Sequence, residues 1–349
     1  MGGPSPTAGA GDRYACAVPT LERLDVHALR EVITAFRDTV RRHQGRLNRL
    51  NVYPVPDGDT GTNMARTLES VVTALDAAPD ADLAAACDAI SHGSLMGARG
   101  NSGVILSQVL RGIAATLKEG ADGTAARVAQ ALGEASTKAY QAVGKPIEGT
   151  ILTVVRESAE AAGEAAARGA DLAGVLRQAR QAGQRALDST PDLLPVLKDA
   201  GVVDAGGAGY LLLLDAALHV VAGDPLPEPP VDAGDDAAAV ERAAAVAHRA
   251  GTDGELDVSE QRYEVMYLMD LPDASIDAFK AGWGAIGDSV VVVGGDGLWN
   301  CHVHTNDIGA AIEVALDLGG RPRNIRVTDL FEEVAEEHAV REAALAAQA

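Results

Sequence analysis

The sequence has few aromatic residues, few cysteines and no surplus of positive charge. Only 3% of its 349 residues are aromatic, so Ala, Leu and Val must fill the core, which favours closely packed helices. The formal net charge of −21 argues against a surface for nucleic acid or anionic membranes, because either would repel the chain. Three widely separated cysteines, Cys16, Cys87 and Cys301, do not suggest a disulfide scaffold. We therefore expect a reducing compartment and a cytoplasmic protein.

Several familiar segments are also missing from the sequence. The N-terminus has no basic start followed by an apolar run, so we expect no signal peptide. We find no run of about eighteen apolar residues and expect a soluble protein without membrane insertion. The phosphate-binding pattern GxxxxGK[ST] is absent, which excludes a P-loop protein. No predicted strand precedes a Gly-rich stretch, which excludes a Rossmann site.

Hydrophobic spacing predicts an all-helical first domain. Residues 1–20 are small and polar and are expected to be disordered. A first helix begins near Asp25, and no segment before residue 224 alternates like a strand. Residues 21–223 are therefore predicted to form a bundle or helical barrel of eight helices. The other seven predicted helices span about 61–77, 82–95, 102–118, 124–142, 149–167, 171–188 and 206–222.

The pattern changes after residue 223. Residues 224–255 begin with DPLPEPPVDAGDD, which is typical of an interdomain linker. Residues 256–330 are predicted to form a second domain in the order βαββαβ, an α+β ferredoxin-like sandwich. Residues 331–349 form an acidic, helix-prone tail that is expected to have little to pack against and to link to a missing C-terminal domain. The second domain's predicted strands and helices span 262–270, 274–284, 289–293, 298–304, 307–318 and 324–327.

The stretch NVYPVPDGDTGTNM at residues 51–64 carries a pair of carboxylates. Its two prolines disfavour a helix before Asp57 and Asp59, and its glycines allow a tight turn that aims both side chains together. Two carboxylates in a loop suit Mg²⁺, which prefers oxygen ligands and is often shared with nucleotide phosphates. The alternative is a solvated Asp-Gly turn.

Three further Gly-rich stretches each stand where a predicted helix begins: GARGNSGVILS at 97–107, GKPIEGT at 144–150 and DAGGAGY at 204–210. Asn101 or Ser102 can cap a helix while the neighbouring glycines let backbone amides approach an anion. Thr150 is placed either to contact a nucleotide or to cap its helix. Each stretch is equally compatible with an ordinary capped helix or interhelical turn.

His302 and His304 are two residues apart on a predicted strand, so both side chains project from one face. Such a pair suits zinc. Val303 is predicted to pack under the helices, which would leave the imidazoles on the open face of the sheet. The alternative is a pair of polar-face histidines, one of which bonds the start of the next helix.

The carboxylate stretch and the three Gly-rich stretches occur in the same order in the ATP-binding subunits of fatty acid kinases, which this sequence resembles. The segment VVVVGGDGLWNCHVHTND also resembles those subunits. The N-terminal domain of those subunits is related to the nucleotide-binding L subunit of dihydroxyacetone kinase. The resemblance covers residues 25–330. It implies an eight-helix barrel that binds Mg-ATP at one end, followed by a smaller α/β domain.

The resemblance also implies roles for individual residues. Asp57 and Asp59 would ligate two magnesium ions, and Asn51 would supply an oxygen where dihydroxyacetone kinases have a third Asp. Glu264 lies near the position of a Cys zinc ligand in similar proteins and would complete a zinc site with the two histidines, since Cys301 faces the other way. The expected nucleotide contacts are Thr60, Thr62, Asn63, Asn101, Ser102, Gly103, Thr150, Gly206 and Gly207.

The implied activity is ATP-dependent phosphorylation of a fatty acid carboxylate to an acyl phosphate. The acid would be presented by a separate, DegV-like fatty-acid-binding carrier protein, and a homodimer is expected. Because a carboxylic acid with a pKa below about 5 is already ionised, no general base is required. Arg99 is either an additional cation for this chemistry or a solvated loop arginine. The alternatives are a dihydroxyacetone-type kinase and a non-catalytic nucleotide-binding scaffold.

Overall fold

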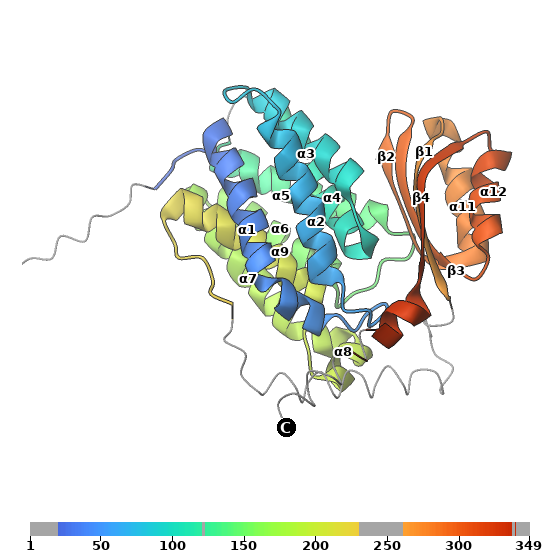
Figure 1. Cartoon of the computed structure of the whole chain (residues 1–349). Helices are drawn as coiled ribbons and strands as arrows, with labels where there is room; N and C mark the ends of the chain where they lie inside the picture. Colours follow the sequence, from blue (N-terminus) through green and yellow to red (C-terminus); the bar gives the residue numbers. More distant parts are fainter. Residues whose placement is uncertain (1–19, 121–122, 230–260, 337–338, 340–349) are drawn as a thin grey trace, which may run out of the picture.

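The computed structural model of the chain describes residues 20–120, 123–229, 261–336 and 339. Within them, a helical unit is followed by a smaller unit built on a four-stranded sheet (Figure 1). Residues 1–19, which contain Cys16, and residues 230–255 of the predicted linker lie outside the described residues.

Nine helices form the described part of the first unit. Eight of them correspond to the predicted helices. The ninth, α8, has six residues, starts at Pro195 and ends against Gly201 in the left-handed conformation. It is too short to show a helical period in the sequence. The helices are α1 (Val26–Leu50), α2 (Thr60–Asp76), α3 (Leu83–Gly97), α4 (Gly100–Glu119), α5 (Ala125–Ala142), α6 (Ile151–Ala167), α7 (Leu172–Leu193), α8 (Pro195–Ala200) and α9 (Ala205–Ala222).

The most apolar helix, α9, lies in the core of the helical unit. It packs against α1, α2, α6 and α7. By length and composition it is apolar enough to cross a membrane, with a mean hydropathy of 1.5 over 18 residues, although Asp215 and His219 interrupt its apolar sequence. Because 67% of this stretch is buried inside the protein, we interpret α9 as a core helix.

The second unit contains an antiparallel sheet with strand order β2-β3-β1-β4. Its elements follow the predicted order of strands and helices. Trp283 and Phe279 pack one face of the sheet against the two helices, together with Cys301 and Val303, which face these helices as expected. The elements are β1 (Tyr263–Asp270), the 3₁₀ turn η2 (Asp273–Ser275), α11 (Ile276–Ile286), β2 (Gly287–Gly295), β3 (Leu298–Thr305), α12 (Ile308–Asp317) and β4 (Arg321–Asp329).

The opposite face of the sheet is covered by the helical unit, so the prediction of an open face is wrong. Met266 and Val291 of this face belong to one buried cluster with Leu95, Ala98 and Val104 of the helical unit. The sheet consequently lies between the helical unit and the α11/α12 pair (Figure 1). A strand with valines on both faces requires cover on both sides.

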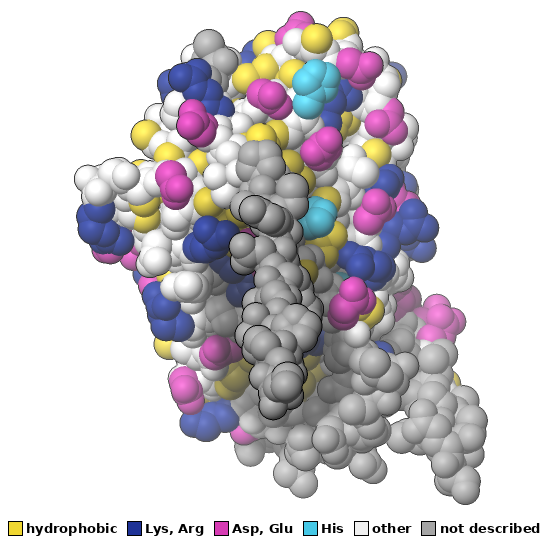
Figure 2. Space-filling model, turned by 90° about the vertical axis from the view of Figure 1, so that its left-hand side faces the viewer, with side chains coloured by type: hydrophobic (Ala, Val, Ile, Leu, Met, Phe, Trp, Pro, Cys, Tyr) yellow, Lys and Arg dark blue, Asp and Glu magenta, His cyan; other side chains and the backbone are white. Residues whose placement is uncertain are grey.

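Hydrogen bonds also join the two units. Asn300 Nδ2 donates to the carbonyl of Leu95 over 2.8 Å, and the amide of Gly144 donates to the carbonyl of Val290 over 3.2 Å. Two of the Gly-rich stretches therefore begin beside the sheet. Acidic and basic side chains are interspersed on the face of the molecule shown in Figure 2.

Candidate functional site

The loop between α1 and α2 is fixed by the side chain of Asn51. Asn51 Nδ2 donates to the carbonyl of Val55 over 2.6 Å, and its Oδ1 accepts from the amide of Thr60 over 3.0 Å and from the Thr60 hydroxyl. Gly58 has φ of +67°, which a residue with a side chain rarely adopts. Asn51 is 3% exposed, so the structure uses it to shape the loop that carries the carboxylates.

The loop brings Asp57 and Asp59 together at the start of α2. Asp59 accepts a hydrogen bond from Asn63 Nδ2, whereas Asp57 Oδ1 is buried without a hydrogen-bond partner among the described residues. Burial raises the pKa of Asp57 well above its ordinary value, with further contributions from Asp59, Glu264 and Glu333. A buried carboxylate oxygen without a donor is costly unless a cation neutralises it. The pair therefore fits Mg²⁺, a cation that oxygen ligands hold.

The start of α4 meets the start of α2 at these carboxylates. The hydroxyls of Thr60 and Ser102 are 3.2 Å apart. Asp59 and Arg99, the N-cap residues of the two helices, make no side-chain capping bond. Backbone amides at such helix starts favour an anion.

Gly100 lies where the start of α4 packs closely on α2. Its φ is +54°, and a side chain there would collide with the side-chain amide nitrogen of Asn63. Nearby, Asn101 Oδ1 is buried without a hydrogen-bond partner in the described part of the chain, and a side chain at Gly103 would collide with the hydroxyl of Thr67. The glycines thus allow α4 to begin beside Asp59.

Several predicted nucleotide contacts make hydrogen bonds within the protein. The Thr62 hydroxyl accepts from Gln44 and Asn48 of α1, each over 3.0 Å. Thr150 caps α6 by accepting from the amide of Leu152 over 3.4 Å and donates to the carbonyl of Ile147 over 2.8 Å. Their contact with a nucleotide stays a prediction.

Gly206 and Gly207 lie in the first turn of α9, which packs closely on α6. A side chain at Gly207 would lie 2.7 Å from Val154 Cγ2. Asp204 caps this turn by accepting from the amide of Gly207 over 2.6 Å. Burial raises the pKa of Asp204 to about 6, although hydrogen bonds from the amides of Gly207, Ile151 and Gly206 oppose the shift.

The four Gly-rich stretches meet at one end of the helical unit. The Thr60–Ser102 contact joins the first stretch to the second, and the bond between Asp204 and the Ile151 amide joins the fourth to the helix that follows the third. Burial raises the pKa of Tyr53, and the nearby charge of Asp204 raises it further. The loop between α1 and α2 therefore lies close to the start of α9.

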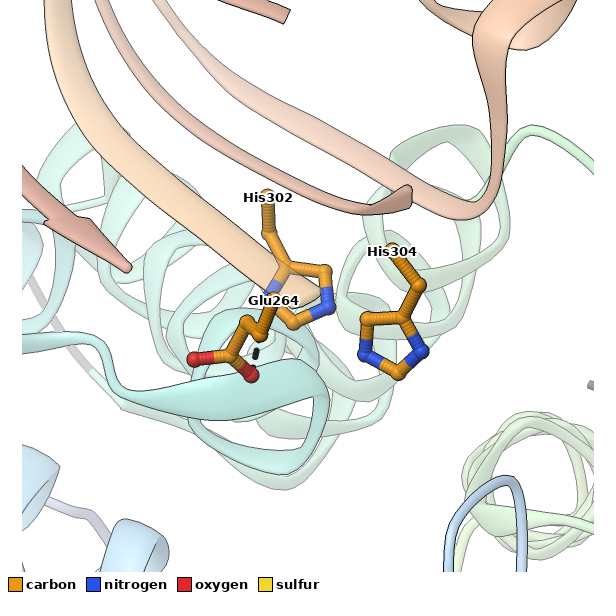
Figure 3. Close-up of side chains that lie close together, drawn as sticks. All are labelled: Glu264, His302 and His304. Carbon is orange, nitrogen blue, oxygen red and sulfur yellow. Dashed lines mark ion pairs between the residues drawn. The ribbon is translucent and has the colours of Figure 1, made fainter. Parts of the chain in front are cut away.

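A second cluster lies on the sheet face that the helical unit covers (Figure 3). His302 Nδ1 is 3.5 Å from Glu264 Oε2, and the two imidazole centroids are 4.9 Å apart. His302 and His304 are 0% and 2% exposed. Both nitrogens of His302 and Nδ1 of His304 lack a hydrogen-bond partner among the described residues. One potential ligand atom from each of the three residues lies within 4.8 Å of the others.

Burial controls the charge of this second cluster. It lowers the pKa of His302 well below its ordinary value and that of His304 to about 4. Burial also raises the pKa of Glu264 to about 8, with smaller contributions from Asp59 and Glu333. At neutral pH the imidazoles are therefore uncharged, the form in which histidine binds a metal.

The acidic group contains one residue that the sequence analysis did not single out, Glu333. The charges of Glu333 and Asp59 act on Glu264 of the histidine cluster, so the two clusters lie near each other. Glu333 belongs to a short helical segment at residues 330–336. Its carboxylate, together with those of Asp57 and Asp59, forms a group whose ligand atoms lie within 4.8 Å of one another. Four of the six tail residues 331–336 are exposed, and Glu333 is half-buried. No motif in this run of acidic residues singled out Glu333.

Three arginines, Arg99, Arg66 and Arg326, lie near one another, and the charge of Arg66 acts on Asp59. The Arg99 side chain turns back and donates to the carbonyls of Gly97 and Ala98 over 3.1 and 2.8 Å. Burial lowers the pKa of Arg99, and the positive charges of Arg326 in β4 and Arg66 in α2 lower it further. This gathering of guanidinium groups suits a phosphate.

Sequence comparison places this geometry in a known family. A profile of the DAK2 domain matches residues 54–219, and a profile of the middle domain of FakA-like fatty acid kinase proteins matches residues 260–337. The chain belongs to the FakA-like, DAK2-domain family. The DAK2 match contains Asp57 and Asp59, and the middle-domain match contains the histidine cluster and Glu333.

Curated relatives of the family align with most of this chain. Protein YloV of Bacillus subtilis is 33% identical over 307 residues, which is 86% of this chain and 54% of YloV. An uncharacterized protein of Staphylococcus saprophyticus is 32% identical over 83% of this chain and 52% of its own length. The chain thus spans about half the length of these relatives.

One solved structure is also similar. It is the dihydroxyacetone kinase from C. freundii in complex with AMP-PNP and Mg²⁺, at a TM-score of 0.42 and 17% identity, covering 63% of this chain and 38% of that one.

Proposed function

We propose that this chain binds Mg-ATP where α2 and α4 begin and transfers the γ-phosphoryl group to a fatty acid carboxylate. The observation that carries the proposal is the Asp57–Asp59 pair, in which a buried carboxylate oxygen lacks a partner among the described residues. The uncapped starts of two helices lie beside this pair and suit the phosphates.

The residues around the pair would perform simple tasks in such a transfer. Asp57 and Asp59 would hold the magnesium, and the magnesium, when bound, neutralises phosphate charge. Thr60, Ser102 and the first amides of α4 would orient the phosphates, while Arg66 would add positive charge at their rim. The acceptor is ionised at neutral pH, since its pKa is below about 5, so the protein need not remove a proton.

The match to the middle domain of FakA-like fatty acid kinase proteins supports a fatty acid as acceptor. A fatty acid is poorly soluble as a free molecule, so we propose delivery by a separate DegV-like lipid-binding protein. A homodimer and a cytoplasmic location are parts of the same proposal. They rest on the family resemblance and on composition.

For the second cluster we propose Zn²⁺ held by Glu264, His302 and His304. The buried imidazole nitrogens without hydrogen-bond partners among the described residues support it, as does the spacing of the three ligand atoms within 4.8 Å. Nitrogen and carboxylate oxygen together form a usual zinc donor set. A zinc ion beside the acidic loop would add positive charge where phosphates are expected.

A dihydroxyacetone-type kinase is the second candidate, and the DAK2 match favours it. Such an enzyme transfers phosphate to a hydroxyl and needs no lipid carrier. A nucleotide-binding scaffold, the third candidate, would bind Mg-ATP without forming any product.

The test supplies the full chain with Mg-ATP, a fatty acid and a lipid-binding carrier protein, and traps acyl phosphate with hydroxylamine. We expect a hydroxamate product that disappears in the double variant Asp57→Asn/Asp59→Asn. Product from dihydroxyacetone alone would favour the second candidate. Mg-ATP binding that depends on the two Asp residues but yields no product with either acceptor would favour the scaffold.

A further inference from the structure

The loop between α1 and α2 supplies two carboxylates but no third negative charge. Asn51 is neutral, and its side-chain oxygen already accepts from the amide and the hydroxyl of Thr60. The third carboxylate at this point comes from elsewhere in the chain. It belongs to Glu333, which follows the last strand of the sheet unit.

The position of Glu333 is fixed by contacts that do not involve the acidic loop. Asp329 ends β4 and pairs with Arg262 at 2.7 Å. The other oxygen of Asp329 caps the helical segment by accepting from the amides of Phe331 and Glu332 over 3.1 and 3.4 Å. The amide of Leu330 donates to the carbonyl of Arg262 over 2.8 Å, and Leu330 is 2% exposed. The sheet unit therefore orients this segment.

One oxygen of this acidic group, Asp57 Oδ1, is buried without a hydrogen-bond partner among the described residues. Independently of the acidic side chains, the fully buried His302 has two ring nitrogens without a hydrogen-bond partner in the described chain. His302 lies beside Glu264, and the Glu264 carboxylate feels the charges of Asp59 and Glu333. Half-buried carboxylates near ring nitrogens that lack hydrogen-bond partners among the described residues are typical of a metal centre.

We propose that Glu333 is a third carboxylate ligand of the divalent cation held by Asp57 and Asp59. The proposal rests on the proposed Mg-ATP site and extends it, because one ligand would come from the sheet unit. The site would be complete only while the sheet unit is docked on the helical unit. Cation binding would then stabilise that docking, since a ligand that binds the docked form favours it.

The test measures Mn²⁺ binding to the full chain by electron paramagnetic resonance, because Mn²⁺ accepts the oxygen ligands of Mg²⁺. The variants are Glu333→Gln, the matched control Glu332→Gln, and Asp57→Asn to identify the site. Glu332 is the exposed neighbour of Glu333 in the same segment, so its variant removes the same charge. We expect Glu333→Gln to weaken Mn²⁺ binding at the Asp57-dependent site about 10- to 100-fold and Glu332→Gln to leave it within about twofold.

The three variants separate the possible failures. Wild-type affinity in Glu333→Gln, with binding lost in Asp57→Asn, would overturn the role of Glu333 and leave the proposed nucleotide site intact. Wild-type affinity in Asp57→Asn would overturn the proposed site itself. Glu333→Asp, which keeps the charge on a shorter side chain, is expected to bind Mn²⁺ with intermediate affinity, and circular dichroism confirms that each variant is folded.

Discussion

The acidic centre formed by Asp57, Asp59 and Glu333 and the cluster formed by Glu264, His302 and His304 are neighbours built in different ways. The acidic centre uses oxygen donors only, on a loop and a helical segment, and its side chains are partly exposed. The histidine cluster adds nitrogen donors on adjacent strands, and its imidazoles are buried. The comparison teaches that the two donor sets differ: oxygen donors alone fit the proposed magnesium, and mixed nitrogen and oxygen donors fit the proposed zinc.

The largest expected effect comes from removing one charge of the acidic centre. Asp57→Asn preserves shape but removes the carboxylate, and we expect phosphoryl transfer to fall about 10²- to 10³-fold, as for a single electrostatic group in a transition state. The measurement is the rate of ATP consumption with acceptor. Asp76→Asn, at the exposed far end of α2, should behave like wild type. A loss below about tenfold in Asp57→Asn would contradict the role of the acidic centre.

The histidine cluster gives the next prediction, which separates the two cations. His302→Gln should lower zinc affinity about 10- to 100-fold while Mn²⁺ binding at the acidic centre stays close to wild type. Metal content is measured by mass spectrometry after dialysis against a weak chelator. His92→Gln, an exposed change on α3, serves as the control. Equal zinc content in both variants would show that the cluster holds no zinc.

Two glycine-to-alanine variants, one at the start of α4 and one on α6, test whether α4 must approach α2 closely at the acidic centre. Gly100→Ala should lower the free energy of unfolding by about 1–2 kcal/mol or more, because Gly100 has positive φ and closely approaches Asn63. Gly163→Ala lies on α6 with no atom within 4 Å of an added side chain, so we expect a gain of about 0.5–1 kcal/mol. Urea unfolding measures both changes. A stabilised Gly100→Ala variant would refute the close approach of α2 and α4.

Two helix N-caps provide the last comparison, which is measured through the pH dependence of stability. The pKa of Asp204 is raised by burial to about 6, so the folded protein holds this proton more tightly than the unfolded chain. The free energy of unfolding should therefore fall as pH rises from about 4 to about 6, by at most about 3 kcal/mol, and level off above. Asp204→Asn keeps a cap and removes this slope.

The control for this experiment is Asp171→Asn at the start of α7. Asp171 caps its helix through the amide of Gly174 over 2.7 Å, but its carboxylate stays in contact with water. Unfolding is followed by circular dichroism at each pH for the wild type and both variants. An unchanged slope in Asp204→Asn would contradict the burial of that carboxylate.

The sequence predicted local features better than contacts between distant segments. Periodicity located eight of the helices because each carries an apolar stripe, and the alternation around Val303 identified the face that packs on α11 and α12. It could not show that the other face packs on the helical unit. That contact joins Asn300 to Leu95 across 205 positions of the chain.

The same limit applied to the candidate site. Asp57 and Asp59 stood out because prolines and glycines surround them in a short stretch. Glu333 did not stand out, because it is one acidic residue among many in its segment. Its position depends on the ion pair between Asp329 and Arg262, which are far apart in the sequence. Asn51 was expected to ligate a metal, yet its hydrogen bonds within the loop depend on a conformation that no local pattern reveals.

The most direct test of the central claim is a crystal structure of the chain with Mn²⁺ and AMP-PNP, in which anomalous scattering locates the metal. The account predicts a manganese peak within coordinating distance of Asp57 and Asp59, with the phosphates at the starts of α2 and α4. A nucleotide and metal bound elsewhere, with Asp57 and Asp59 free of both, would contradict it.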